Sequence, residues 1–229
     1  MTAIETDQYT ALRRLLDERW TCRQFRPEPV PRETLEQLLL AAQRTPSWCN
    51  TQPWRVEVTD GAGTERFRTA LGEHLTAPDG GPDFPFPPGY AGVYQQRRRE
   101  CGSQLYASVG IERGDRAAAF RQTMRNFDFF DAPHVAIVST PAELGVYAAV
   151  DCGLYLNSFL LAAQSLGLGA APQAALATYA PFVRRHFGIP DDHRVVAGIS
   201  FGYPDPEHPV NNFRTTRADL TDTVHFHSA

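Results

Sequence analysis

The stretch PSWCNTQPW, residues 46–54, decides how this chain is interpreted. It places small, hydroxyl and amide side chains between two prolines, and proline favours extended or turn backbone over helix. We therefore expect a loop. The side chains of Ser47, Asn50 and Gln52 supply hydrogen-bond donors and acceptors within a few residues. Such a loop suits a flat heterocyclic ligand that is rich in hydrogen-bonding atoms.

A second informative segment, RWTCRQF at residues 19–25, lies upstream of this loop. Arg19, Thr21 and Arg23 alternate, so in extended backbone their side chains share one face. Two guanidinium groups and a hydroxyl on one face suit a phosphate, because charge-assisted arginine–phosphate hydrogen bonds are strong. A solvated basic turn is the alternative interpretation of the same residues. A phosphate site and a polar ring site together describe flavin mononucleotide (FMN).

The two segments, at this spacing, resemble the FMN-dependent nitroreductase family. The family patterns are Arg-x-Ser/Thr-x-Arg/Lys after a first helix and Pro-Ser-x-x-Asn-x-Gln-Pro-Trp. The resemblance spans roughly residues 9–224, and GYPDP at 202–206 favours the nitrobenzoate-reductase-like branch. It implies an α+β fold, in which a central, mostly antiparallel sheet is flanked by helices in an intertwined homodimer.

The resemblance also implies which residues bind FMN. The alternating arginines would hold the phosphate, and Arg217 or Arg214 would close over it from the C-terminal tail. The 46–54 loop would lie against the ring and ribityl chain of the FMN in the partner subunit, with Gln52 alternatively holding the loop in shape. The expected cofactor-binding residues are Arg19, Thr21, Arg23, Pro46, Ser47, Trp48, Asn50, Gln52, Arg125, Asn126, Pro172, Gln173, Ala174, Arg214 and Arg217.

Two further segments in this set have specific roles in the family. Arg125 or Asn126, upstream of Asp-Ala-Pro at 131–133, would face the flavin pyrimidine edge, and the choice between them stays open. A donor or cation there stabilises the negative charge of the reduced flavin. The segment 167–175, which resembles a family turn and includes Pro172, Gln173 and Ala174, would bring backbone amides toward flavin N5 and O4. Trp48 and Cys49 depart from the small residues common in the family, and a bulky ring there would narrow the site.

The implied function is an oxidoreductase that uses NAD(P)H to reduce a nitroaromatic, quinone or similar conjugated acceptor. FMN performs the redox step, so we expect no catalytic side chain and no metal. A single shared site implies ping-pong kinetics, and no Gly-x-Gly-x-x-Gly motif for a separate nicotinamide domain is present. Three alternatives stay open: another reaction of the same superfamily, such as dehalogenation, flavin fragmentation or dehydrogenation; a non-catalytic flavin-binding protein; and an arginine-rich scaffold without cofactor.

Composition fits one soluble domain. The chain has 229 residues, 42% of them hydrophobic and 21% charged, with a net charge of −4. This balance does not favour nucleic-acid or membrane-surface binding. Four widely spaced cysteines and the lack of a visible signal peptide predict a cytoplasmic protein. We expect a single domain over 1–229, with a lid-like insertion at 77–100 and an extended tail at 204–229.

Hydrophobic periodicity predicts the elements. The expected helices are 7–18, 31–44, 64–75, 103–122, 145–166 and 178–187. The expected strands are 54–58, 134–138 and 194–200, and 77–94 is expected to be a loop with aromatic residues. The apolar helix at 145–166 is expected to be buried nearly all round, near the dimer core.

Overall fold

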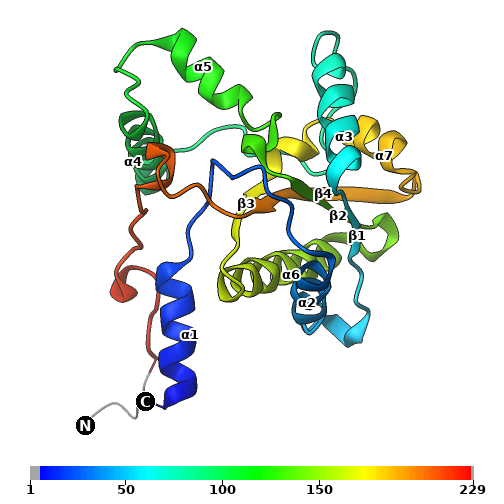
Figure 1. Cartoon of the computed structure of the whole chain (residues 1–229). Coiled ribbons are helices and arrows are strands. Elements are labelled where there is room, and N and C mark those ends of the chain that lie inside the picture. The colour runs from blue at the N-terminus through cyan, green and yellow to red at the C-terminus, as the bar shows by residue number, and fades with distance from the viewer. Residues whose placement is uncertain (1–5, 228–229) are drawn as a thin grey trace.

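The structure, a computed structural model, describes residues 6–227 and contains a four-stranded antiparallel sheet flanked by helices (Figure 1). The strand order is β1-β2-β4-β3. The strands are β1 (Arg55–Val58), β2 (His134–Pro141), β3 (Gly169–Gln173) and β4 (His193–Gly202). This architecture confirms the predicted α+β class with an antiparallel sheet.

Helices cover both faces of the sheet, so its central strands are almost continuously apolar. The helices are α1 (Asp7–Glu18), α2 (Arg32–Ala42), α3 (Gly61–His74), α4 (Gly92–Ser108), α5 (Arg116–Met124), α6 (Gly145–Ser165) and α7 (Ala180–Phe187). Alternate β2 side chains point to opposite faces. Ala136 and Val138 pack in the core under α2 and α6, whereas Val135 and Ile137 pack in the core under α3 and α7.

The segment after α1 lies along the free edge of β3. The Cys22 backbone N–H donates to the Ala170 carbonyl at 3.1 Å, and Thr21 forms a parallel bridge with Ala170. A Cβ on Gly169 would lie 2.8 Å from Cys22 Cβ, so glycine is needed for this close approach. The fold thus places the predicted phosphate-binding segment at the edge of the sheet.

Several expectations about the elements are wrong. Helix α4 begins at Gly92, inside the stretch 77–94 that was expected to be a loop. The predicted helix at 103–122 is two helices, because α4 ends at Ser108 and α5 begins only at Arg116. Gly110 and Gly114 have φ values of 69° and 100° in the intervening turn, which suit glycine. The stretch after Gly167, expected to be a turn, contains β3.

Helix α6 also differs from expectation, because one of its faces is exposed. Val146, Val150 and Leu154 repeat every fourth residue and are 67%, 53% and 45% exposed. The opposite face packs against α2, β2 and β3. Residues 142–165 contain an 18-residue window with a mean hydropathy of 1.4 and are, by length and composition alone, the one membrane-span candidate in the described residues. The packing is that of a core helix with one uncovered apolar side.

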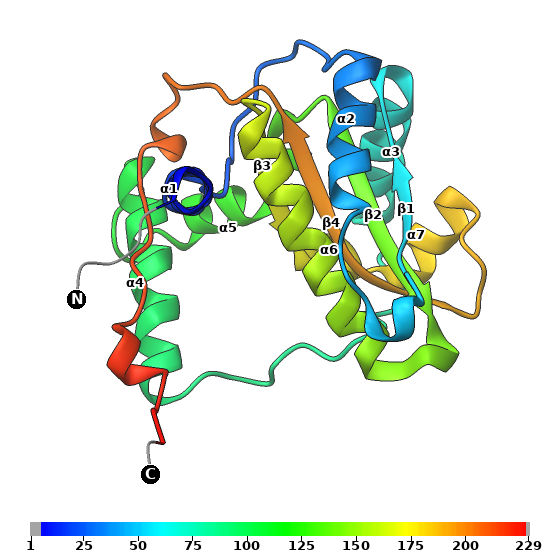
Figure 2. The same cartoon turned by 90° about the horizontal axis from the view of Figure 1, so that it is seen from below.

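Helices α4 and α5 lie beside the sheet rather than on it (Figure 2). An extended stretch at 77–91 crosses from the end of α3 to α4, and the C-terminal tail runs back past α4 toward α1. Asp83 anchors the beginning of this stretch, where it accepts hydrogen bonds from Arg184 of α7 and from the Val195 backbone N–H. Helix α4 and the tail therefore frame the edge of β3.

Candidate cofactor site

A cavity of about 310 Å³ lies between the end of α1, the segment along β3, and the tail. All five residues predicted to bind a phosphate line it: Arg19, Thr21, Arg23, Arg214 and Arg217. We call this space the arginine cavity. Its walls come from opposite ends of the sequence. A larger cavity of about 730 Å³ between α4 and the tail shares Cys101, Thr215 and Arg217 with it.

Backbone carbonyls, a hydroxyl and aromatic rings hold Arg23, Arg214 and Arg217 in place. The Arg214 guanidinium stacks 4.4 Å from the Trp20 ring centroid and donates to the Asn211 carbonyl at 2.7 Å. Arg23 lies over the Phe213 ring at 5.4 Å. Arg217 Nη1 donates to Thr215 Oγ1 at 3.0 Å. Arginines fixed in this way lose little freedom when they bind an anion.

The positive charge of the arginine cavity has no balancing carboxylate within residues 6–227. None of the ion pairs there includes its four arginines, and Asp17 in its wall pairs with Arg13 at 3.4 Å. Burial lowers the pKa of Arg19, and the nearby positive charge of Arg217 lowers that pKa further. Burial also lowers the pKa of Arg23. Partly desolvated cations without partners are costly, so the cavity fits a phosphate group.

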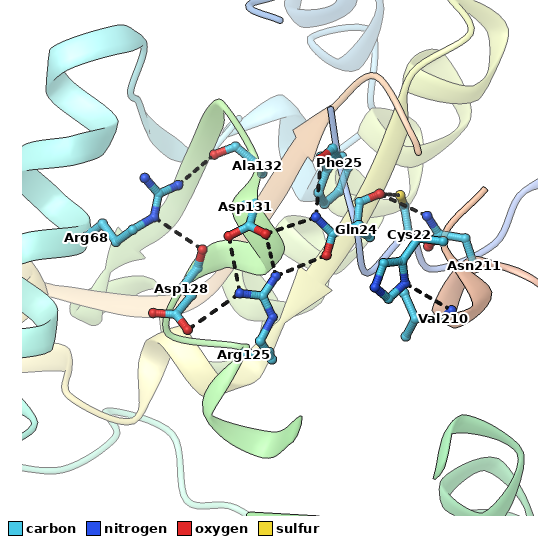
Figure 3. A network of polar contacts seen from close by, with 11 residues as sticks. Cys22, Gln24, Phe25, Arg68, Arg125, Asp128, Asp131, Ala132, Val210 and Asn211 are labelled. Carbon is cyan, nitrogen blue, oxygen red and sulfur yellow. Dashed lines mark hydrogen bonds and ion pairs between the residues drawn. The ribbon is translucent and has the colours of Figure 1, made fainter. Parts of the chain in front are cut away.

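Next along the chain, Gln24 enters a polar network with Arg125, Asp128 and Asp131 (Figure 3). We call these four residues the Arg125 network. Arg125 follows α5 and donates Nη2 to Asp131 Oδ2 at 2.7 Å and Nη1 to Asp131 Oδ1 at 3.2 Å. Burial opposes ionisation of Asp131, but hydrogen bonds from Arg125 and Gln24 outweigh it and lower the pKa of Asp131.

Asn126 and Gln173, from two separate predicted motifs, contact each other. Gln173 Nε2 donates to the Asn126 carbonyl at 2.8 Å and to Asn126 Oδ1 at 3.2 Å. Asn126 Nδ2 donates to the Thr123 carbonyl at 2.9 Å. Both ends of the Asn126 amide are therefore used within the chain. Gln173 is buried, while Pro172 and Ala174 beside it are exposed.

Asn211 joins the arginine cavity to the Arg125 network. Its Oδ1 accepts the Arg23 backbone N–H at 2.8 Å, and its Nδ2 donates to the Gln24 carbonyl at 2.9 Å. Sequence reasoning gave Asn211 no role in the site. Pairing with Asp128 was the alternative interpretation of Arg125 and Asn126, and an Asp128 carboxylate oxygen lies 3.7 Å from Arg125 Nη1. The contact of Gln24 with Arg125 and Asp131 was missed, because these residues are about 100 positions apart and meet only after folding.

The 46–54 loop packs on α6 through Trp48. The Trp48 backbone N–H lies 3.2 Å from both carboxylate oxygens of the buried Asp151, and its ring lies edge-on to Tyr147 at 4.5 Å. Ser47 Oγ accepts the Gln52 backbone N–H at 2.9 Å, and Gln52 Nε2 donates to the Asn50 carbonyl at 3.3 Å. Gln52 thus helps to hold the loop in shape.

The loop and the arginine cavity do not meet within one chain. No residue of the loop lines the arginine cavity in the described part of the chain, and Trp48 and Cys49 line a separate cavity of about 170 Å³ with Asp151. Figure 2 shows the loop near the N-terminal end of α6, away from α1 and the tail. The structure therefore separates the predicted phosphate contacts from the predicted ring contacts of this loop.

Left-handed backbone marks two of the predicted site segments. Cys49, Asn50 and Gln52 have positive φ values, and so do Phe129, Phe130 and Asp131 beside Arg125. Within residues 6–227 these are the only non-glycine residues with positive φ. Such backbone is energetically costly and clusters at binding sites, where the surrounding structure enforces it.

An antiparallel α+β protein whose sheet edge carries a cavity of unpaired arginines belongs to the class that binds phosphorylated cofactors. The model of the Nitroreductase family matches residues 16–203, and this chain belongs to that family. It is 38% identical to nitroreductase NfnB of Mycolicibacterium smegmatis over 98% of this chain and 96% of that protein. It is 31% identical to 4-nitrobenzoate reductase of Pseudomonas putida over 98% and 97% of the two chains.

A solved structure gives the same result. The crystal structure of FMN-dependent NfnB from Mycobacterium smegmatis in complex with NADPH matches with a TM-score of 0.91 at 38% identity, covering 97% of this chain and 100% of that one. The resemblance to nitroreductases and the α+β fold with an antiparallel sheet are both confirmed.

Proposed function

We propose that this protein is an FMN-dependent oxidoreductase that uses NAD(P)H to reduce a nitroaromatic, quinone or similar conjugated acceptor. The single observation that carries the proposal is the arginine cavity, whose unpaired guanidinium groups fit the FMN phosphate. The relatives agree, since NfnB was solved with NADPH and two others are named 4-nitrobenzoate reductases. When bound, FMN supplies the hydride and electron chemistry.

The chain's own residues bind and orient this cofactor. Arg19, Thr21, Arg23, Arg214 and Arg217 hold the phosphate. Arg125 faces the pyrimidine edge, because Asp131 and Gln24 occupy only some of its five N–H donors, whereas both ends of the Asn126 amide are used within the chain. The backbone around the exposed residues Pro172 and Ala174 approaches the flavin ring. The buried Gln173 holds Asn126 in place by donating a hydrogen bond to its carbonyl.

A homodimer completes the site. The exposed apolar face of α6 suits a second copy of the same helix, and two-fold pairing is the commonest way to cover such a face. The 46–54 loop, which lies apart from the arginine cavity of its own chain, then contacts the FMN of the partner with Pro46, Ser47, Trp48 and Asn50. Trp48 narrows the acceptor side.

The remaining parts complete one FMN-binding domain over residues 1–229. The 77–100 insertion covers the acceptor, and its Phe86 and Tyr90 side chains are exposed for stacking. The 204–229 tail closes over the phosphate with Arg217. The four cysteines are free thiols, which supports a cytoplasmic location.

An anaerobic absorbance spectrum tests the function. Purified protein, supplied with FMN, should show a bound-flavin spectrum that bleaches when stoichiometric NADPH or NADH is added. A flavin spectrum that persists with either donor would favour a non-catalytic flavin-binding protein. Protein that takes up no FMN would overturn the assignment.

Mixing two variants, assayed at an FMN concentration at which only the wild type binds the cofactor, tests the shared site. Arg19→Ala damages the phosphate half, and Trp48→Gly damages the loop half. If each site uses the arginines of one chain and the loop of the other, refolding the two variants together should restore about a quarter of wild-type activity, since half of random dimers carry one intact site. No recovery, with both variants folded and dimeric, would place both halves in one chain.

A further inference from the structure

The cation nearest the expected flavin pyrimidine edge is already paired. Asp131 binds both terminal nitrogens of Arg125, at 2.7 Å and 3.2 Å, and an Asp128 carboxylate oxygen lies 3.7 Å from Nη1. A two-point arginine–carboxylate contact fixes orientation and offsets charge. The carboxylates of Asp131 and Asp128 therefore reduce the positive electrostatic potential that a ligand beside Arg125 experiences.

Gln24 closes this arrangement into a ring of hydrogen bonds (Figure 3). Its Oε1 accepts from Arg125 Nη2 at 3.1 Å, and its Nε2 donates to Asp131 Oδ2 at 2.9 Å. Its carbonyl is fixed by Asn211 at 2.9 Å and by the Asp205 backbone N–H at 3.1 Å. Gln24 directly follows Arg23, which lines the arginine cavity, and it binds Arg125. The position of Arg125 therefore depends on the backbone that also positions the arginine cavity.

The turn that carries Asp131 cannot easily swing away. Phe129, Phe130 and Asp131 have φ values of 58°, 54° and 62°, and both phenylalanines are buried. Phe129 stacks on Phe67 at 4.9 Å, and Arg68 Nη2 donates to the Ala132 carbonyl at 3.0 Å. Packing thus enforces a costly backbone that presents a carboxylate to Arg125.

We propose that Asp131, oriented by Gln24 and assisted by Asp128, limits how much of the Arg125 charge reaches the bound flavin and so lowers its reduction potential. This inference rests on the proposed function. Reduction adds negative charge to the flavin, and a cation at its edge stabilises the reduced form more than the oxidised form. A carboxylate on that cation removes part of this preference. Asp131 and Gln24 are positioning residues, since they act through Arg125.

The reduction potential of bound FMN, measured by anaerobic redox titration against a reference dye, tests the proposal. Asp131→Asn should shift the potential to more positive values, because it removes a charge at a position where asparagine tolerates the left-handed backbone. Asp128→Asn should give a smaller shift in the same direction. Arg125→Gln should shift the potential to more negative values, since two carboxylates then remain without their cation.

Glu36→Gln is the matched control, because it also removes a carboxylate paired with an arginine, Arg32 at 2.8 Å on α2. Its potential should equal that of the wild type. A purely structural role of Asp131 would weaken oxidised and reduced FMN equally and leave the potential unchanged, which would overturn the proposal. Shifts of the reduction potential that are equal in size and direction in Asp131→Asn and Arg125→Gln would also overturn the proposal. Wild-type protein that binds no FMN would instead overturn the proposed function itself.

Discussion

At the scale of single residues, the arginine cavity shows how function differs from stability. Ion pairs on the surface of this protein, such as Arg13–Asp17 and Arg32–Glu36, contribute little to stability. Arg19 has no side-chain hydrogen bond or ion pair within residues 6–227, although it is half-buried beside Arg217. The FMN phosphate is the partner that we propose for it. The spacing of Arg19, Thr21 and Arg23 alone also fits a solvated basic turn, and the resemblance to the family was needed to predict a phosphate site.

Arg19→Ala should weaken FMN binding without harming the fold. The variant loses a charge-assisted contact to the phosphate, which corresponds to a dissociation constant about 10- to 150-fold higher. The apoprotein should keep its melting temperature, because Arg19 supports no other described residue. Flavin-fluorescence titration measures the affinity. Arg32→Ala, on exposed α2, is the control and should bind FMN normally.

The four cysteines should react very differently with iodoacetamide. Burial raises the pKa of Cys22 and of Cys152 to about 12, so neither presents thiolate at pH 8. Cys101 lines both cavities beside the tail and should be labelled in the apoprotein. Saturating FMN should slow that labelling, as peptide mass spectrometry would show. Equal labelling of Cys101 with and without FMN would place the cofactor elsewhere.

At the scale of elements, segments with a clear hydrophobic period could be predicted from the sequence. Segments that are ordered by pairing with a distant part of the chain could not. Helices α1, α2 and α7 and strand β4 lie close to their predicted ranges because their hydrophobic patterns are local. Strand β3 was missed because its sequence, GAAPQ, has little strand propensity, and its pairing with β4 supplies the order. The Arg125 network was missed for the same reason, since Gln24 and Arg125 meet only across the fold.

The stretch at 77–91 should lose its anchor when Asp83 is replaced. Asp83 and Arg184 are 9% and 12% exposed, so Asp83→Ala leaves a buried arginine and the Val195 N–H without their partner. We expect a loss of about 3–5 kcal/mol in the free energy of unfolding. Urea denaturation measures it. Asp79→Ala is the control, because it breaks an exposed ion pair with Arg185, which follows Arg184 on α7. It should lower the free energy of unfolding by at most about 1 kcal/mol.

At the scale of the whole molecule, the uncovered face of α6 and the distance between the two half-sites have one explanation. In the proposed homodimer, a second copy covers the helix and brings its 46–54 loop to the arginine cavity. The sequence predicted a helix over 145–166 that is buried nearly all round, but one face of α6 is exposed in the single chain. An apolar pattern cannot distinguish burial within a chain from burial between two chains.

Val150→Glu should separate the dimer and remove FMN together. The side chain is 53% exposed in the single chain, so a charge there should leave the monomer folded. Light scattering after size exclusion should report a monomer, and flavin absorbance should be lost because the partner's loop is missing. Val150→Ile preserves the apolar face and should stay dimeric and yellow. A dimeric Val150→Glu with full FMN would place the interface elsewhere.

The arginine cavity joins residue 19 to residue 217, and this has a consequence for the protein's synthesis. Chains are made from the N-terminus, so Arg19 and Arg23 emerge long before Arg214 and Arg217. Cofactor capture by the proposed site therefore waits until residues 214–217 have been made. A chain cut short before residue 214 should fold but should stay colourless when FMN is supplied.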